Sequence, residues 1–250
     1  MTIDSSNIPY RVCLCGEFVD LPLFRASTDG FLINCSIQPR YPFLTRCGMA
    51  TSSRYVATQL WGKDLPTNLS SNELATILYT TEREHYDTLT GTSDAFGIVL
   101  PGVSAIHYGI NDVWADNLFS LTDYDTLQFI HDYVYLLYTH PRVTGFNPCV
   151  SICQNQHAIK QLMQSSRDCW YAIRQHDPKL LGLAMNECYN AQTSLLPLIE
   201  TPQIRSMREE LSDHIYGSKL TGGGGGGYLV VVSDVPIENS IRLYPTGFNE

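Results

Sequence analysis

The sequence predicts an α+β protein in which helices and strands form two layers. In the first half, Tyr10–Cys15 and Phe31–Ile37 have the pattern of short strands. In the second half, Tyr228–Val232 is an apolar run of β-branched and aromatic residues, which is typical of a buried strand. Helical segments precede this strand at about 154–174, 177–195 and 202–216. Strands before and after a helical block favour an open-faced α/β sandwich for the second half.

The remaining elements follow from local signals. A helix through Trp61 is expected after Gly48–Ser53, and the capping box Ser70–Glu73 opens a helix to about Tyr86. Phe129–Thr139 has a strand-like pattern. The pattern loosens before that strand, so we place a domain boundary near residue 120. It divides the chain into domains 1–120 and 121–250.

The composition argues against several classes of function. The net charge is −9 and lysine and arginine do not cluster, so a nucleic-acid partner is not expected. No secretory signal follows Met1, and no apolar run is long enough to cross a membrane. We therefore expect a cytoplasmic protein without a membrane partner. The eight cysteines lack the spacing of a zinc site and are expected to be reduced.

A run of six glycines, Gly222–Gly227, stands directly before the last predicted strand. Taken alone, such a run is better explained as a linker or a tight turn than as a phosphate-binding loop. Its position argues against a linker, because it joins a helical segment to a strand inside one domain. Glycines at this point can adopt φ > 0 and lie close to a ligand, with N–H groups that face an anion.

The stretch Gly48–Ser53 leads into the first predicted helix. Small and hydroxyl residues at a helix start leave N–H groups exposed, and the helix dipole favours an anion there. Ordinary N-capping by Thr51 or Ser52 explains the same residues without any ligand.

Four carboxylates are candidates for chemistry. Glu82 falls on the apolar side of its helix, so it needs a partner inside the protein. A metal ion and an arginine explain this position equally well. Asp94 ends a glycine-led turn farther along the chain. Glu17 and Asp20 follow the first strand, and in the absence of a ligand they would be ordinary solvated loop acids.

Taken in order, these motifs resemble those of the GHMP small-molecule kinases. Tyr10–Pro22 is similar to the family's first motif, and its Asp20-Leu21-Pro22 resembles the heptose-phosphate and fucose kinase branch. Gly48–Ser53 resembles the phosphate loop, and Lys219–Tyr228 resembles the glycine-rich third motif. The family's acid pair and a strand-end motif have counterparts in Glu82, Asp94 and Tyr138-Thr139-x2-Arg142.

The resemblance implies a ribosomal-protein-S5-like N-terminal half and a ferredoxin-like C-terminal half, with nucleotide and substrate between them. It implies a kinase that uses ATP and Mg²⁺ to phosphorylate a sugar or sugar phosphate, and it leaves a homodimer open. Asp94 would orient or deprotonate the attacking hydroxyl, and Arg11 would neutralise charge on the transferred phosphoryl group. Ser52 and Glu82 would hold Mg²⁺. The other implied contacts are to the nucleotide, from Gly48, Ala50, Thr51, Ser52 and Ser53, and to the substrate, from Glu17, Asp20, Gly30, Arg142, Gly223, Gly224 and Gly225.

Two departures from the family's pattern favour an alternative. Only Tyr41–Cys47 separates the second strand from the phosphate loop, where the family has more strand and helix. Within it, Arg46 and Cys47 stand where glycine and small residues are usual. Ala50 replaces a loop glycine, and strain at a positive φ would cost about 1–2 kcal/mol. The alternative function is a catalytically impaired pseudokinase that serves as a ligand-binding or interaction module.

Overall fold

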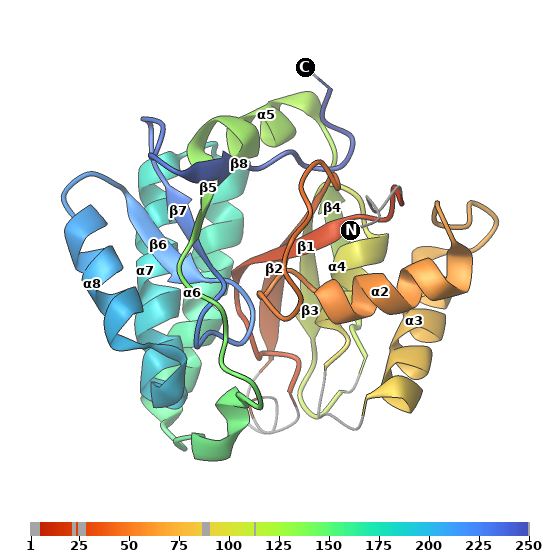
Figure 1. Ribbon diagram of the computed structural model, residues 1–250, viewed down its shortest axis with the longest axis horizontal. Coiled ribbons are helices and arrows are strands. Elements are labelled where there is room, and N and C mark those ends of the chain that lie inside the picture. Colours follow the sequence, from red (N-terminus) through yellow and green to blue (C-terminus); the bar gives the residue numbers. More distant parts are fainter. Residues whose placement is uncertain (1–5, 22–23, 25–28, 87–90, 113, 250) are drawn as a thin grey trace.

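The computed structural model describes residues 6–21, 24, 29–86, 91–112 and 114–249. This part of the chain contains two four-stranded antiparallel sheets and helices that pack against both (Figure 1). The predicted α+β class is therefore confirmed.

The first sheet consists of β1 (Tyr10–Cys15), β2 (Gly30–Ile37), β3 (Val103–Tyr108) and β4 (Asn117–Leu121), which lie side by side in that order. The bounds of β1 match the prediction, and β2 starts one residue earlier than expected. The register of β1 against β2 shifts between Cys13 and Cys15, where the chain leaves the sheet toward Gly16. The edge strand β4 was missed because its residues are exposed or half-buried and carry no strong apolar pattern.

The described part of the first half contains the helices α2 (Thr51–Trp61), α3 (Ser71–His85) and α4 (Ser93–Val99). They pack on one another, and α4 contacts β1, β2 and β3. The capping box of α3 is present, because the Ser70 hydroxyl accepts a bond from the Glu73 N–H while the Glu73 carboxylate accepts one from the Ser70 N–H.

The second sheet contains β5 (Val134–Tyr138), β6 (Gly217–Leu220), β7 (Tyr228–Val232) and β8 (Ser240–Arg242), in the order β6-β7-β5-β8. All of β7 is buried, as predicted. The glycine run connects β6 to β7, which are antiparallel neighbours. The run is therefore a connection inside one sheet, and the linker explanation is wrong.

The second half also contains α5 (Tyr124–Tyr133), α6 (Gln156–Arg174), α7 (Pro178–Leu195), α8 (Pro202–Leu211) and two short 3₁₀ helices, η1 (Pro148–Ser151) and η2 (Pro197–Ile199). Helices α6 and α7 pack along each other. Helix α6 contacts β1 and β2, whereas α7 contacts β1, β6 and β7 (Figure 1). This helix pair joins the two sheets, and one hydrophobic core runs through both halves.

Two predicted elements need correction. The strand expected at Phe129–Thr139 is wrong in its first part, because α5 extends to Tyr133 and the strand begins only at Val134. The Asp123 carboxylate caps α5 by accepting a bond from the Thr126 N–H. His131 and Asp132 interrupt the apolar residues just before this junction, and this break was not used in placing the strand.

The third helical segment ends at Leu211 instead of residue 216, and β6 follows it. The sequence of β6, Gly-Ser-Lys-Leu, has little strand character. Its pairing with the apolar strand β7 holds it in the sheet.

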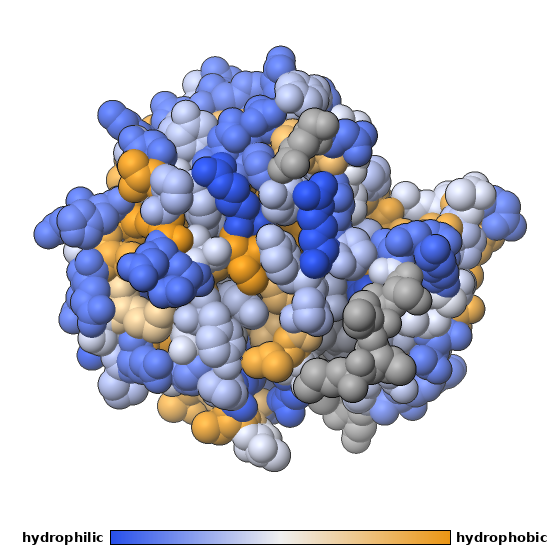
Figure 2. Space-filling view, turned by 45° about the horizontal axis from the view of Figure 1, so that its top comes forward, coloured by the Kyte–Doolittle hydropathy of each residue, from blue (hydrophilic) through white to orange (hydrophobic). Residues whose placement is uncertain are grey.

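The first sheet is built from residues 10–121 and the second from residues 134–242. The domain boundary near residue 120 remains a proposal. No helix in the described ranges combines the length and apolar character that crossing a bilayer requires. The face drawn in Figure 2 mixes hydrophilic side chains with smaller hydrophobic patches.

The start of α2 has an unusual backbone. Ala50 is the N-cap residue and has φ 51° and ψ 38°, the left-handed conformation, without a side-chain cap. Thr51 and Ser52 do not cap the helix; the Thr51 hydroxyl accepts a bond from the Arg46 N–H instead. The N-capping explanation for these residues is therefore wrong. Strain at Ala50 is present in the fold itself.

We expect Ala50→Gly to stabilise the protein by up to about 1 kcal/mol. Glycine removes the penalty of about 1–2 kcal/mol for the left-handed conformation, but part of this gain is offset because the unfolded chain becomes more flexible. Urea unfolding measures the difference. Ala57→Gly, in the buried middle of the same helix, is the matched control and should destabilise the protein by about 1 kcal/mol or more. A destabilised Ala50→Gly variant would show that the left-handed backbone of Ala50 does not cost stability.

Candidate active site

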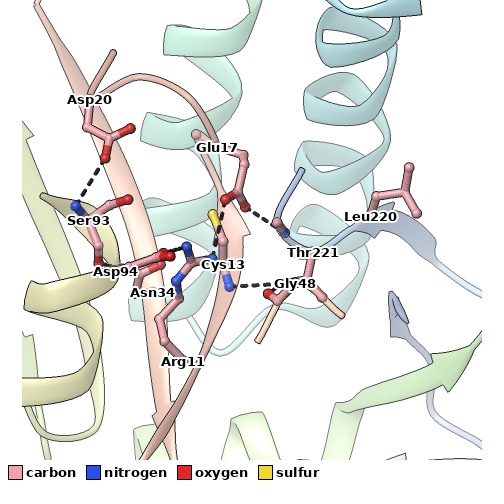
Figure 3. A network of polar contacts seen from close by, with 12 residues as sticks. Arg11, Cys13, Glu17, Asp20, Asn34, Gly48, Ser93, Asp94, Leu220 and Thr221 are labelled. Atoms are coloured by element: carbon pink, nitrogen blue, oxygen red, sulfur yellow. Dashed lines mark hydrogen bonds and ion pairs between the residues drawn. The ribbon is translucent and has the colours of Figure 1, made fainter. Parts of the chain in front are cut away.

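Arg11 on β1 is the centre of a buried polar network (Figure 3). Its side chain is 3% exposed and pairs with both Glu17 and Asp94. The distance from its Nη1 to Glu17 Oε1 is 3.3 Å. The side of the arginine packs on Gly97 of α4, where a Cβ would come within 2.2 Å of Arg11 Cγ. Helix α4 can approach β1 this closely because glycine stands at that point.

Glu17 lies between two buried cations. Its Oε2 atom is 4.0 Å from Lys219 Nζ, and it accepts a hydrogen bond of 2.9 Å from the Gly222 N–H. Burial raises the pKa of Glu17, but Arg11, Lys219 and the Gly222 N–H outweigh burial and hold the pKa below its ordinary value. Glu17 is therefore a buried carboxylate that stays ionised, and it connects β1 to the glycine run.

Lys219 is fully buried at the end of β6. Its ammonium group donates to the carbonyl oxygens of Cys13 at 3.1 Å and Leu220 at 2.5 Å. Burial lowers the pKa of Lys219, but the neighbouring Cys13 and Cys188 thiols and then the Glu17 carboxylate raise it above its ordinary value. A charged lysine that donates to two carbonyl oxygens thus holds the start of the glycine run against β1.

Thr221 joins three of the sequence motifs. Its hydroxyl donates to the Gly48 carbonyl at 3.0 Å and accepts a bond of 3.3 Å from the Cys13 N–H. A Cβ on Gly48 would stand 2.1 Å from the Thr221 carbonyl oxygen, so only glycine fits at that position of the loop. The first motif, the phosphate loop and the glycine run therefore meet at one hydroxyl group (Figure 3).

The glycine run is held in a defined conformation. Five of its six residues have positive φ, namely Gly222, Gly224, Gly225, Gly226 and Gly227. The N–H groups of Gly225 and Gly227 donate to the carbonyls of Ile199 and His140. Gly223 is the member that is partly exposed. The need for φ > 0 explains why glycine repeats here.

Asp20 approaches the site from the loop after β1. Its Oδ2 accepts a hydrogen bond of 3.0 Å from the Ser93 N–H, at the start of α4 (Figure 3). Burial raises the pKa of Asp20 above its ordinary value. Gly91 packs directly against this carboxylate. Asp20 is thus buried and holds the turn that carries Asp94. Pro22, from the same motif, lies outside the described residues.

Glu82 faces inward from α3, as predicted, and is 5% exposed. Its Oε2 accepts a hydrogen bond of 2.6 Å from the Ser53 hydroxyl, and Ser52 is a further hydrogen-bond partner. Burial raises the pKa of Glu82, and the serines and the more distant Arg11 only partly offset this. No arginine forms an ion pair with Glu82 among the described residues, so the partner seen is a serine.

The comparisons with known proteins concern the fold. Residues 171–238 match the family model of the GHMP kinase C-terminal domain. The chain has the fold of the GHMP kinases. The structure of L. major mevalonate kinase in complex with R-mevalonate has a TM-score of 0.64 at 14% identity, over 93% of this chain and 89% of that chain. No curated protein matches the chain in sequence.

Two further GHMP structures are similar in the same way. A D-glycero-D-manno-heptose 1-phosphate kinase from Bacteriodes thetaiotaomicron has a TM-score of 0.62 at 13% identity, over 90% of this chain and 87% of that chain. Lactococcus lactis galactokinase complexed with galactose has a TM-score of 0.58 at 12% identity, over 90% and 84%. The resemblance seen in the motifs is therefore confirmed at the level of the fold.

Within this GHMP fold, the predicted site residues form two connected groups. Arg11, Glu17 and Asp94 form one network, which Gly222 and Gly48 join through backbone contacts. Ser52, Ser53 and Glu82 form a second group at the start of α2. Arg142 lies beside Gly223, since its Nη1 is 3.9 Å from the place of a Cβ on that residue.

Gly30 differs from the other predicted site residues. A Cβ at Gly30 would stand 2.2 Å from Met163 Sδ on α6 and 2.9 Å from Val19. Its observed role is close packing between β2 and a helix. Contact with a substrate remains a prediction for this residue.

Sequence reasoning assigned no role to Lys219, Thr221 and Asn34, which complete the network. The Asn34 amide donates to the Ser93 carbonyl at 3.0 Å and is fully buried. A lysine next to a glycine run in a chain with few charges was an available signal. The burial of Lys219 could not be predicted, because it depends on the pairing of β6 with β7 and β6 was not predicted.

We expect Glu17→Gln to destabilise the protein by about 3–5 kcal/mol at pH 7, because it leaves Lys219 and part of Arg11 buried without a counter-charge. Because the pKa of Glu17 is lowered on folding, its contribution is present above the unfolded pKa and is lost as the pH falls through the folded value. The difference in stability between wild type and variant should therefore begin to shrink below about pH 4.3, the ordinary pKa of glutamate, and vanish only below the folded pKa.

Urea unfolding from pH 3 to pH 8 checks this, with Glu84→Gln on the exposed side of α3 as the control. The difference between wild type and variant is the quantity to follow. Burial raises the pKa of Asp20 and Glu82, so these two groups make the protein more stable as the pH falls, which is opposite to the effect of Glu17. They are present in both proteins and therefore cancel in the difference. A pH-independent difference would contradict the ionised state of Glu17.

Proposed function

We propose that this protein is a small-molecule kinase that transfers a phosphoryl group from ATP, with Mg²⁺, to a hydroxyl of a sugar or sugar phosphate. The observation that carries the proposal is the Arg11–Asp94 pair, held in a GHMP fold beside the phosphate loop and the glycine run. Phosphoryl transfer needs mainly positioning and neutralisation of spreading negative charge.

The exposure of the pair supports a division of roles. The Asp94 side chain is 29% exposed, whereas Arg11 is 3% exposed. Asp94 is therefore accessible to a hydroxyl group and can accept its proton, and Arg11 behind it supplies fixed positive charge. The buried Arg11 Nε has no hydrogen-bond partner among the described residues, so it is a donor that fits a phosphoryl oxygen.

The residues at the start of α2 fit Mg²⁺ and the nucleotide phosphates. Glu82 is a buried carboxylate whose described partners are neutral hydroxyls, and a cation would lower the cost of its ionisation. Mg²⁺ usually takes one or two carboxylates together with substrate phosphates and water, so Glu82 and Ser52 are sufficient. When bound, the ion would neutralise charge on the phosphates. Gly48, Ala50, Thr51, Ser52 and Ser53 would contact those phosphates from the N-terminus of the helix.

A sugar acceptor is supported by the first motif and by the heptose-phosphate kinase and galactokinase among the similar structures. Mevalonate kinases share the fold, so the fold alone does not select the acceptor. Glu17 and Asp20 would contact sugar hydroxyls, and Gly30, Arg142 and Gly223–Gly225 would complete the acceptor side. The net charge of −9 supports the absence of a nucleic-acid partner. A cytoplasmic location and a homodimer remain predictions.

We expect Asp94→Asn to lower kcat by about 100- to 10,000-fold, the usual contribution of a positioned acid or base. Circular dichroism and the melting temperature should show a folded protein. The measurement is ADP release with a panel of sugars and sugar phosphates, and Asp213→Asn, at an exposed position after α8, is the control. Full activity of Asp94→Asn would refute the assigned role.

The pseudokinase alternative is favoured by one observation, the left-handed backbone of Ala50 inside the phosphate loop. Binding of Mg–ATP separates the two functions. At a hundredfold excess over Kd, a ligand that binds only the folded state stabilises it by about 2.7 kcal/mol. We expect a saturable rise in melting temperature with Mg–ATP. No response to any nucleotide would favour the pseudokinase.

A further inference from the structure

Two arginines meet beside the glycine run, outside the network of Arg11. Arg46 precedes the phosphate loop, and Arg142 follows β5. Both contact Phe146: the Arg46 Nη2 donates to its carbonyl oxygen at 2.9 Å, and the Arg142 guanidinium carbon lies 5.7 Å from the centre of its ring. The same ring packs against Gly225. Two positive side chains from distant parts of the chain therefore converge on one residue.

Arg142 has no carboxylate in direct contact among the described residues, and Glu17 acts on its charge only from a distance. Its Nε and Nη2 atoms are buried and have no hydrogen-bond partner in the described part of the chain. No carboxylate within the described ranges forms an ion pair with Arg142 or Arg46. Burial and the charge of Arg46 lower the pKa of Arg142. A guanidinium group that is both buried and next to another cation is costly unless an anion joins it.

The glycine run adds backbone donors at the same place. Arg142 Nη1 is 3.9 Å from the position of a Cβ on Gly223, and the Arg142 backbone nitrogen packs against Gly226. The N–H groups of Gly223, Gly224 and Gly226 donate to no acceptor in the part of the chain that the structure describes. Successive backbone N–H groups in turn conformations, such as those of Gly223 and Gly224, form concave sites for anions.

We propose that Arg46, Arg142 and the free N–H groups of the glycine run form a binding subsite for a phosphate group of a ligand. Planar guanidinium groups recognise phosphate oxygens through paired, charge-assisted hydrogen bonds, and a phosphate supplies the acceptors that the buried Nε and Nη2 of Arg142 lack. The phosphate can belong to the nucleotide or to a phosphorylated acceptor. The role of the subsite in catalysis rests on the proposed kinase function, but its affinity for phosphate does not.

Arg46 adds a second cation to this subsite from an unusual backbone conformation. Its φ is 58°, a conformation that favours glycine. Arginine at a strained position, with its guanidinium directed to Phe146, adds charge beside Arg142. The strain also provides a clean test, because Arg46→Gly removes the charge and suits the backbone.

The test is isothermal titration of the full chain with inorganic pyrophosphate, which needs no turnover. We expect Arg142→Gln to weaken pyrophosphate binding by about tenfold or more, and Arg46→Gly to weaken it several-fold. Arg174→Gln, at an exposed position at the end of α6, is the matched control and should leave binding unchanged. Circular dichroism and melting temperature confirm that each variant is folded.

Two further titrations identify the source of the phosphate. Mg–ADP is one probe, and galactose 1-phosphate compared with galactose is the other. Loss of affinity for Mg–ADP alone in Arg46→Gly and Arg142→Gln assigns the subsite to the nucleotide. Loss for the sugar phosphate alone, with galactose unaffected, assigns it to the acceptor.

The inference is overturned if the wild type binds no pyrophosphate, Mg–ADP or sugar phosphate, or if Arg142→Gln binds them as the wild type does. Its failure is distinguishable from failure of the kinase assignment. If the wild type releases no ADP but binds pyrophosphate in a way that depends on Arg142, the subsite is kept and the kinase assignment is rejected. If the wild type is active and both arginine variants are as active as the wild type, the kinase assignment is kept and the subsite is rejected.

Discussion

The structure depends on a charge arrangement at the junction of its two sheets. Two buried cations, Arg11 and Lys219, are balanced by two carboxylates, Glu17 and Asp94. These residues come from both ends of the chain, and Glu17 contacts both cations. Removing one charge of such a set leaves another buried without a partner, which costs several kcal/mol. Formation of the site is therefore inseparable from docking of the glycine run on the first sheet.

Neutral contacts make this junction tighter. Thr221 connects Cys13 and Gly48 through one hydroxyl, and Gly48 lets the phosphate loop lie directly against the backbone of Thr221. Helices α6 and α7 add a common hydrophobic core under both sheets. The chemistry proposed for the site thus relies on contacts between segments that are about 200 residues apart in sequence, such as Cys13 and Thr221, whose separation is 208.

Much of the fold could be predicted because local signals were strong. The apolar runs of β1 and β7 and the capping box of α3 each fix their own element. The strands β4, β6 and β8 were missed because short, polar or half-exposed strands take their conformation from the partner strand. The helix α5 was missed because its Phe129 and Ile130 were read together with the apolar residues of β5, although His131 and Asp132 separate the two groups.

The candidate site was predictable to a similar extent. The inward position of Glu82 followed from helical periodicity, and the family motifs indicated Arg11, Glu17 and Asp94. Three features depend on tertiary packing and follow from no local pattern: the burial of Lys219, the Arg142 Nε and Nη2 atoms that lack a partner in the described part of the chain, and the proximity of Arg142 to Arg46.

The positive φ angles of the glycine run have a consequence for affinity. A flexible loop that closes over a phosphate loses conformational entropy at each encounter with the ligand. Here the left-handed turns and the hydrogen bonds to Ile199 and His140 are set when the chain folds, so that loss has already occurred before a ligand arrives. For the proposed phosphate subsite, this means that the run would be preorganised for its ligand.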